Sequence, residues 1–204
     1  PEYFDRTTQY LDQGKWGLAQ QEALNARDAL QPGSIRSRAS LHPLATAYWM
    51  QGDHEASLRS LRSMSTEIFT AIEGGSNNAD SEDDAFAAIA AGILAQRMGD
   101  RSIALEIMQR LNKRQDLLKT PPLDALFVVL RANDLRLSGE PAAAIELLKP
   151  LINGSEPFQA HVALLDSYAA VGSKQKALEE ARWLIRSRGR AYAEPGCAWC
   201  QQSL

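Results

Sequence analysis

One pattern occurs five times along the chain and constrains its fold more than any other feature. In each copy an apolar stretch leads to a glycine, a small residue follows five positions after that glycine, and an apolar residue follows twelve positions after it. Successive glycines lie 38, 47, 40 and 33 residues apart. We therefore expect one structural unit to repeat along the chain. The copies are Gly14 with Ala19 and Ala26, Gly52 with Ser57 and Met64, Gly99 with Ala104 and Leu111, Gly139 with Ala144 and Leu151, and Gly172 with Ala177 and Leu184.

The residue types in the pattern favour a pair of helices joined by a tight turn. Glycine takes the left-handed backbone conformation that ends the first helix of such a pair. The small residue lets the second helix approach the first closely, and apolar stripes on both helices are buried between neighbouring pairs. Alanine and leucine make up more than a quarter of the chain, which also favours helices. One pair cannot bury its own apolar face, so we expect the pairs to stack.

Five segments carry this pattern in a form that resembles the tetratricopeptide repeat (TPR) family. They read YLDQGKWGLAQQEALNARDALQP, AYWMQGDHEASLRSLRSMS, LAQRMGDRSIALEIMQRL, LRLSGEPAAAIELLKPL and YAAVGSKQKALEEARWLI. The resemblance covers about residues 1–188 and implies an all-α fold, a right-handed superhelical solenoid of antiparallel helix pairs with about ten helices. It divides the chain into a TPR-like helical-repeat domain, residues 1–190, and a C-terminal tail, residues 191–204.

Local signals place two helix starts between the repeats. Thr120 stands before Pro121, which predicts an N-cap residue followed by a proline in the first turn. The polar stretch 74–84 predicts an exposed loop. At its end Ser81 and Asp84 resemble a capping box, so we expect the next helix to begin there.

The overall charge gives no sign of a nucleic-acid or membrane-surface binder. Lysine and arginine number 22 and aspartate and glutamate 25, which leaves a formal charge of -3. No apolar run approaches the length of a membrane helix, so we expect no membrane insertion by this segment. Four basic residues near the end of the last repeat could attract phosphate, but we interpret them as a solvated helix end whose cations complement the helix dipole. They are Arg182, Arg186, Arg188 and Arg190.

Cys197 and Cys200 form a Cys-x-x-Cys pair in the tail. Gln201 stands where covalent haem attachment requires histidine, and a structural zinc site would need two further ligands, whereas the three histidines lie far apart in sequence. We expect a local disulfide or two incidental thiols, with no metal and no cofactor.

The sequence contains no recognisable catalytic motif. It lacks a glycine-rich phosphate loop, an HExxH pair and a GxSxG elbow, so we expect no enzyme. The resemblance instead implies a concave groove lined by the first helix of each unit. In that register Ile89, Val129 and Val162 fall either in the groove or in the core. The other groove positions are Phe4, Thr8, Leu11, Thr46, Trp49, Ile93, Arg97, Asn133, Arg136 and Asp166.

These observations predict a non-catalytic module that binds a protein or peptide in its groove. The mixture of aromatic, aliphatic and arginine side chains is typical of protein interfaces. The alternative is a sensory or regulatory region of a larger bacterial signalling or transcription-regulating protein, since the chain opens on Pro1 and carries paired cysteines. The composition suggests a bacterial source, and cytoplasm and periplasm fit equally well.

Overall fold

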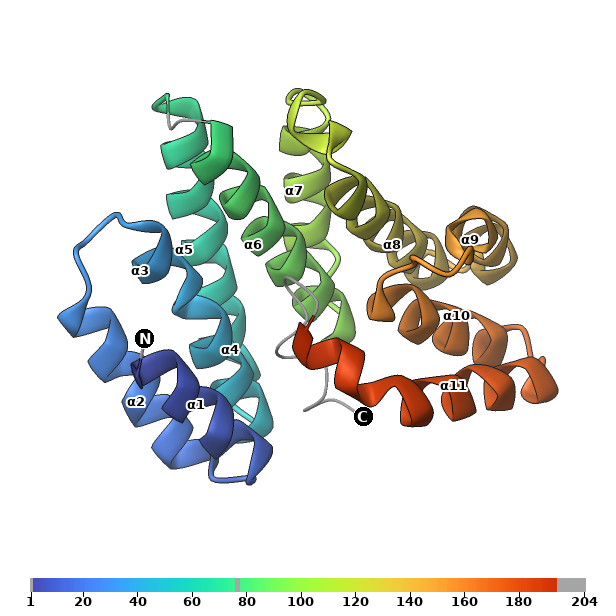
Figure 1. The fold of residues 1–204 in the computed structure, drawn as a ribbon, viewed down its shortest axis with the longest axis horizontal. Helices are drawn as coiled ribbons and strands as arrows, with labels where there is room; N and C mark the ends of the chain where they lie inside the picture. The colour runs from blue at the N-terminus through green and yellow to red at the C-terminus, as the bar shows by residue number, and fades with distance from the viewer. Residues whose placement is uncertain (1, 76–77, 194–204) are drawn as a thin grey trace.

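The computed structural model of the chain describes residues 2–75 and 78–193, and these residues form helices and no strand (Figure 1). The all-α prediction is confirmed. Two short 3-10 helices, η1 (Leu117–Lys119) and η2 (Lys149–Leu151), accompany the α-helices. The α-helices are α1 (Glu2–Asp12), α2 (Trp16–Ala29), α3 (Ile35–Ala39), α4 (Leu41–Met50), α5 (His54–Glu73), α6 (Asn78–Arg97), α7 (Ser102–Leu111), α8 (Pro121–Leu137), α9 (Pro141–Leu148), α10 (Phe158–Ala170) and α11 (Lys174–Ala193).

Helices that follow one another along the chain pack together. The two helices on either side of each repeat glycine contact each other, namely α1 with α2, α4 with α5, α6 with α7, α8 with α9, and α10 with α11. Each of these pairs also contacts the next, through α2 and α4, α5 and α6, α6 and α8, and α8 and α10. In Figure 1 the molecule extends from α1 and α2 on the left to α9 and α10 on the right, and α11 runs from that end back towards the middle.

The turn inside each pair has the geometry that the sequence predicts. All five repeat glycines have a positive φ, between 69° at Gly14 and 90° at Gly139. The small residues five positions later are buried in the first four pairs. In the last pair Ala177 is half-buried, because α11 packs chiefly against α10 and has no later pair beside it among the described residues.

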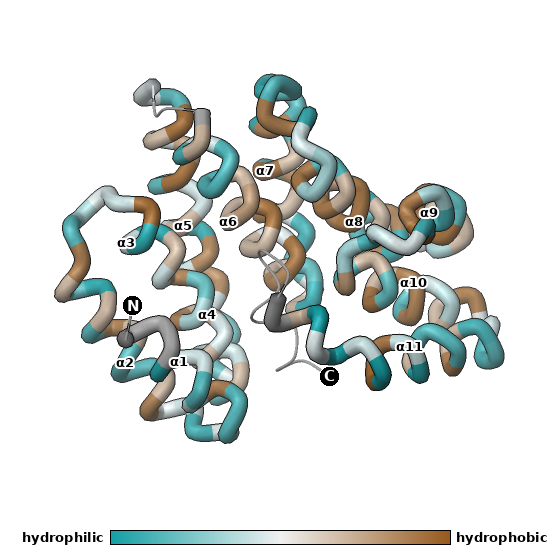
Figure 2. The backbone as a smooth tube through the Cα atoms, viewed as in Figure 1, coloured by the Kyte–Doolittle hydropathy of each residue, from teal (hydrophilic) through white to brown (hydrophobic). Residues whose placement is uncertain are grey.

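One continuous apolar core runs through the middle of the molecule, from α2 to α10. In Figure 2 residues coloured as apolar recur along the helices that contribute to this core. Three helices approach one another closely at Gly92 of α6, where a Cβ atom would lie 2.8 Å from Leu130 Cδ1 of α8 and 3.3 Å from Ile107 Cδ1 of α7. The absence of a side chain at Gly92 thus sets how closely α6, α7 and α8 approach one another.

The structure corrects the expected loop at residues 74–84. Gly74 and Gly75 form a turn, and α6 already begins at Asn78, so Ser81 and Asp84 lie inside the helix rather than at its start. Both side chains are buried. The physical reason is that Asp84 forms an ion pair with Arg38 of α3, which draws this polar stretch into the interior.

The other boundary predictions have mixed outcomes. Thr120 occupies the N-cap of α8 and Pro121 its first turn, as expected. At the far end α11 continues to Ala193, beyond the expected domain limit at residue 190. As predicted, none of the helices in the described part of the chain is both long and apolar enough to cross a membrane.

Candidate functional site

Several residues predicted to line a groove lie in the interior. Leu11, Thr46 and Ile93 are buried, as are Ile89, Val129 and Val162, for which the core was the alternative. Leu11 packs with residues of α2 and α4, Ile93 belongs to the central core, and Thr46 Oγ1 donates a hydrogen bond to the His42 carbonyl at 3.0 Å. The groove role of Leu11, Thr46 and Ile93 is therefore corrected, because neighbouring helices cover their side chains.

A second group of predicted residues comes together across three helices. Arg97 of α6, Arg136 of α8 and Asp166 of α10 form what we call the arginine cluster. Arg136 Nη2 lies 3.7 Å from Asp166 Oδ2, and the two side chains are 19% and 41% exposed. Arg97 is half-buried and within electrostatic range of both. Asn133, one turn before Arg136 on α8, is buried.

The arginine cluster carries more positive than negative charge in a partly desolvated place. Burial lowers the pKa of the Arg97 guanidinium, Asp166 raises it and Arg136 lowers it further, so the net direction is downward. Arg136 Nε is buried and donates no hydrogen bond to any of the described residues. A carboxylate bound by the exposed part of the Arg136 guanidinium would offset the repulsion between the two guanidinium groups. The cluster is thus suited to receive an additional acidic group.

The remaining predicted groove residues belong to earlier helix pairs. Thr8 of α1 and Trp49 of α4 are half-buried, and Trp49 packs against the central core. Phe4 falls within α1, but its side chain lies outside the described residues. Cys197 and Cys200 also lie outside them, so the predicted disulfide stays a prediction.

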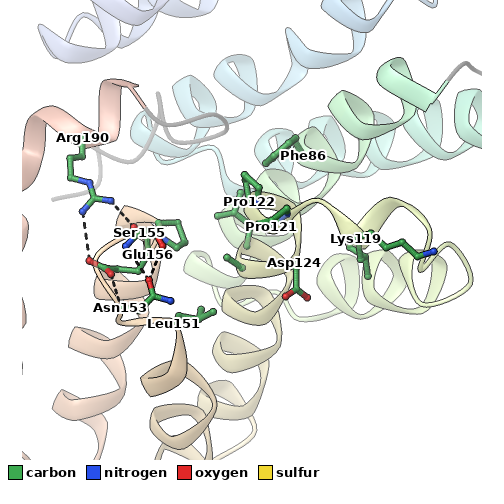
Figure 3. Close-up of a pocket in the computed structure, with 14 residues that line it drawn as sticks. Phe86, Lys119, Pro121, Pro122, Asp124, Leu151, Asn153, Ser155, Glu156 and Arg190 are labelled. Carbon is green, nitrogen blue, oxygen red and sulfur yellow. Dashed lines mark hydrogen bonds and ion pairs between the residues drawn. The ribbon is translucent and has the colours of Figure 1, made fainter.

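A pocket of about 830 Å³ opens between the beginnings of α8 and α10. Figure 3 shows that Phe86 of α6 and Pro121 and Pro122 of α8 form one side of the pocket, whereas Glu156 and Arg190 form the opposite side. Its volume is within the range of small-molecule sites. No local sequence pattern predicts this pocket, because its walls come from segments that are up to about a hundred residues apart in the chain.

A partly buried network, of which Glu156 and Arg190 line the pocket, connects α10 to α11. His161 Nδ1 lies 2.6 Å from Glu180 Oε2, and His161 Nε2 lies 3.3 Å from Glu156 Oε1. The imidazole stacks on the Trp183 ring with centroids 3.4 Å apart. Arg190 Nη2 donates a hydrogen bond to the Glu156 carbonyl at 2.8 Å. These side chains bind one another, so the network is suited to holding α11 in place.

Glu156 is the carboxylate of that network that contacts both His161 and Arg190. Burial raises the pKa of its carboxyl group, but hydrogen bonds from the backbone amides of Glu156, Gly154 and Asn153 and from His161 lower it by more, so the net direction is downward. The carboxylate form is therefore the stable one here. Among the described residues no three histidine, cysteine, aspartate or glutamate side chains are placed to hold a metal ion.

No family model, no curated protein and no solved structure matches this chain. The geometry therefore defines the protein as an all-helical chain of sequentially packed helices, with the arginine cluster and the pocket as its candidate sites.

Proposed function

We propose that the helix pairs form a right-handed superhelical solenoid of the TPR type, and that the chain is a non-catalytic module that binds a segment of a partner protein. Two observations support the architecture: the positive φ of all five repeat glycines and the contact of each helix pair with the next. Stacked pairs of this kind expose a continuous surface formed by equivalent helices, which suits an extended ligand.

The arginine cluster carries the functional part of the proposal. Its residues come from α6, α8 and α10, the first helices of three successive pairs, so a segment crossing these helices would contact all of them. Asp166 contributes one negative charge beside two guanidinium groups. We infer that the partner segment is acidic and places a carboxylate between Arg97 and Arg136. The preformed arrangement limits the entropy lost on binding.

A selection from a randomised peptide library tests this function. The unmodified chain is expected to enrich peptides with aspartate or glutamate at a fixed position, because a carboxylate at the cluster gains charge-assisted hydrogen bonds. The double variant Arg97→Glu/Arg136→Glu should lose these peptides. Arg131→Glu is the matched control, since Arg131 is exposed on the same helix as Arg136. Circular dichroism verifies that both variants keep their helices.

Two results would count against the groove. One is enrichment of the same peptides by the double variant. The other is loss of binding in Arg131→Glu to the same degree, which would show a general effect of charge. The alternative role, a sensory region of a larger signalling protein, would use the same surface. The protein segments encoded on either side of this one in its gene distinguish a separate binding module from such a sensory region.

A further inference from the structure

The outward face of α11 is a second surface with unusual properties. This helix packs chiefly against α10, and it turns Leu184 and Ala191 inward. On another face of the helix Leu178 and Ile185 are 45% and 71% exposed, and Ile185 is far more exposed than a large aliphatic side chain usually is. The end of the molecule thus presents apolar side chains to solvent.

The spacing of these side chains fits contact with another helix. Leu178 and Ile185 are seven residues apart, which places them about two turns, or roughly 10 Å, from each other on one face of α11. Ala181 lies between them, three residues after Leu178. Apolar residues at intervals of three and four form the seam along which two helices pack.

Basic side chains border this seam. Lys174, Arg182, Arg186 and Arg188 are exposed on α11, and Glu179 is the exposed acidic residue beside them. Within the described part of the chain, Lys174, Arg182 and Arg186 make no ion pair. The helix dipole accounts for cations in the last turns, but Lys174 and Arg182 lie in the first turn and the middle of the helix. Because the whole chain is acidic, this face is locally opposite in sign.

We propose that this face, which we call the α11 surface (Lys174, Leu178, Ala181, Arg182, Ile185 and Arg186), binds an acidic amphipathic helix of a partner protein. Apolar residues of that helix cover Leu178 and Ile185, and its flanking carboxylates face Arg182 and Arg186. The proposal is independent of the arginine cluster, which lies on α6, α8 and α10.

Charge and shape favour this partner over three others. A second copy presenting the same surface would bring arginines against arginines. A nucleic acid offers no apolar partner for Leu178 and Ile185. A membrane-surface helix has a broad apolar face with aromatic residues, whereas the α11 surface has two large aliphatic side chains.

The test is a selection from a library of helical peptides. The library has a constant apolar seam, and the flanking positions vary among glutamate, lysine and glutamine. The full chain is expected to select peptides rich in glutamate. Their affinity should fall about tenfold or more in Ile185→Glu and in Arg182→Glu. The affinity should be unchanged in Arg131→Glu and in Arg97→Glu/Arg136→Glu. Failure of this proposal can therefore be told apart from failure of the proposal for the arginine cluster.

Three outcomes would overturn the proposal. One is selection of lysine-rich or uncharged peptides, and another is selection of peptides that bind Ile185→Glu as well as the unmodified chain. The third is flotation of the chain with vesicles of phosphatidylserine and phosphatidylcholine that is lost in Ile185→Glu, which would assign the surface to a membrane. Arg131, Arg182 and Ile185 are exposed, so their variants are expected to fold. The side chains of Arg97 and Arg136 are partly buried, so circular dichroism checks that Arg97→Glu/Arg136→Glu keeps its helices.

Discussion

At the scale of single residues, His42 shows how burial controls charge. It is buried in α4, and burial lowers the pKa of its imidazole to about 4, although a hydrogen bond with the Ala90 backbone acts in the opposite direction. The neutral ring is thus the form that fits between α4 and α6. In the unfolded chain the same ring titrates near its ordinary value of about 6.5.

This difference predicts a loss of stability in mild acid. Because the folded-state pKa is the lower one, the unfolded chain binds the proton first, and stability decreases as the pH falls from about 6.5 towards 4. Between pH 7 and pH 4.5 His42 should account for a loss of about 2–3 kcal/mol. Urea unfolding at both pH values measures this loss of stability. The loss should be smaller in His42→Gln. It should persist in the control His54→Gln, since His54 is exposed.

NMR provides a measurement that does not depend on a folded variant. The ring nitrogens of His42 should report a neutral imidazole at pH 5 in the unmodified chain. A ring that is already protonated at pH 5 would contradict the burial argument.

At the scale of helices, the ion pair between Arg38 and Asp84 joins α3 to α6. Arg38 Nε donates to Asp84 Oδ1 at 2.9 Å, Arg38 Nη2 donates to Asp84 Oδ2 at 2.6 Å, and both side chains are buried. Burial raises the pKa of Asp84 and the contacts with Arg38 lower it, with a net direction upward. Desolvation is therefore a large part of the energetics of this pair, as is usual for buried ions.

The pair predicts unequal effects of single and double substitutions. Asp84→Ala should lower the free energy of unfolding by about 3–5 kcal/mol, because Arg38 remains buried without its carboxylate. The double variant Arg38→Met/Asp84→Leu should recover most of that loss, since it leaves no buried charge. Denaturant unfolding of the three proteins measures the effect, and a double variant less stable than Asp84→Ala would contradict it.

Gly92 predicts a contrast between two helical glycines. Gly92→Ala should cost about 1–3 kcal/mol, because the new methyl group meets Leu130 and Ile107, which are fully buried. Gly17→Ala in α2 should instead raise stability by up to about 1 kcal/mol, since nothing lies near that site and alanine favours the helix. Thermal unfolding compares them, and equal shifts in Tm would refute the close approach at Gly92.

The same elements show what a sequence can and cannot predict. The turns were predictable because a glycine with positive φ is a local requirement, visible at Gly52 or Gly172 without knowledge of the rest of the fold. The start of α6 could not be predicted, because it depends on the contact of Asp84 with Arg38, which lies 46 residues earlier. The residues of the arginine cluster could be predicted, because Arg97, Arg136 and Asp166 occupy related positions in successive repeats. The network around His161 could not be predicted, because Glu180 lies 19 residues away on another helix.

At the scale of the whole molecule, a chain of stacked pairs should lose its last element without unfolding elsewhere. Each pair contacts only its neighbours closely, so stability is approximately a sum over local interfaces. His161→Leu removes the partner of the Glu180 carboxylate and should loosen α11 while α1 to α6 stay folded. Hydrogen exchange measures this.

Amide protons of α11 should exchange about tenfold faster or more in His161→Leu, with those of α5 and α6 unchanged. Arg186→Ala is the control, since it alters an exposed residue of the same helix and should leave exchange unchanged. A uniform increase over all helices would instead indicate a single cooperative unit and would weaken the case for stacked repeats.

A charge-swap experiment tests the central proposal, that the arginine cluster binds an acidic segment, most directly. One peptide selected by the unmodified chain is used, together with a variant of it in which the acidic residue common to the selected peptides becomes lysine. The affinity of each peptide is measured for the unmodified chain and for Arg136→Glu. Each single change should weaken binding about tenfold or more, and the two changes together should restore part of it, because opposite charges face each other again. Strictly additive losses in this cycle would contradict a contact between the peptide carboxylate and Arg136.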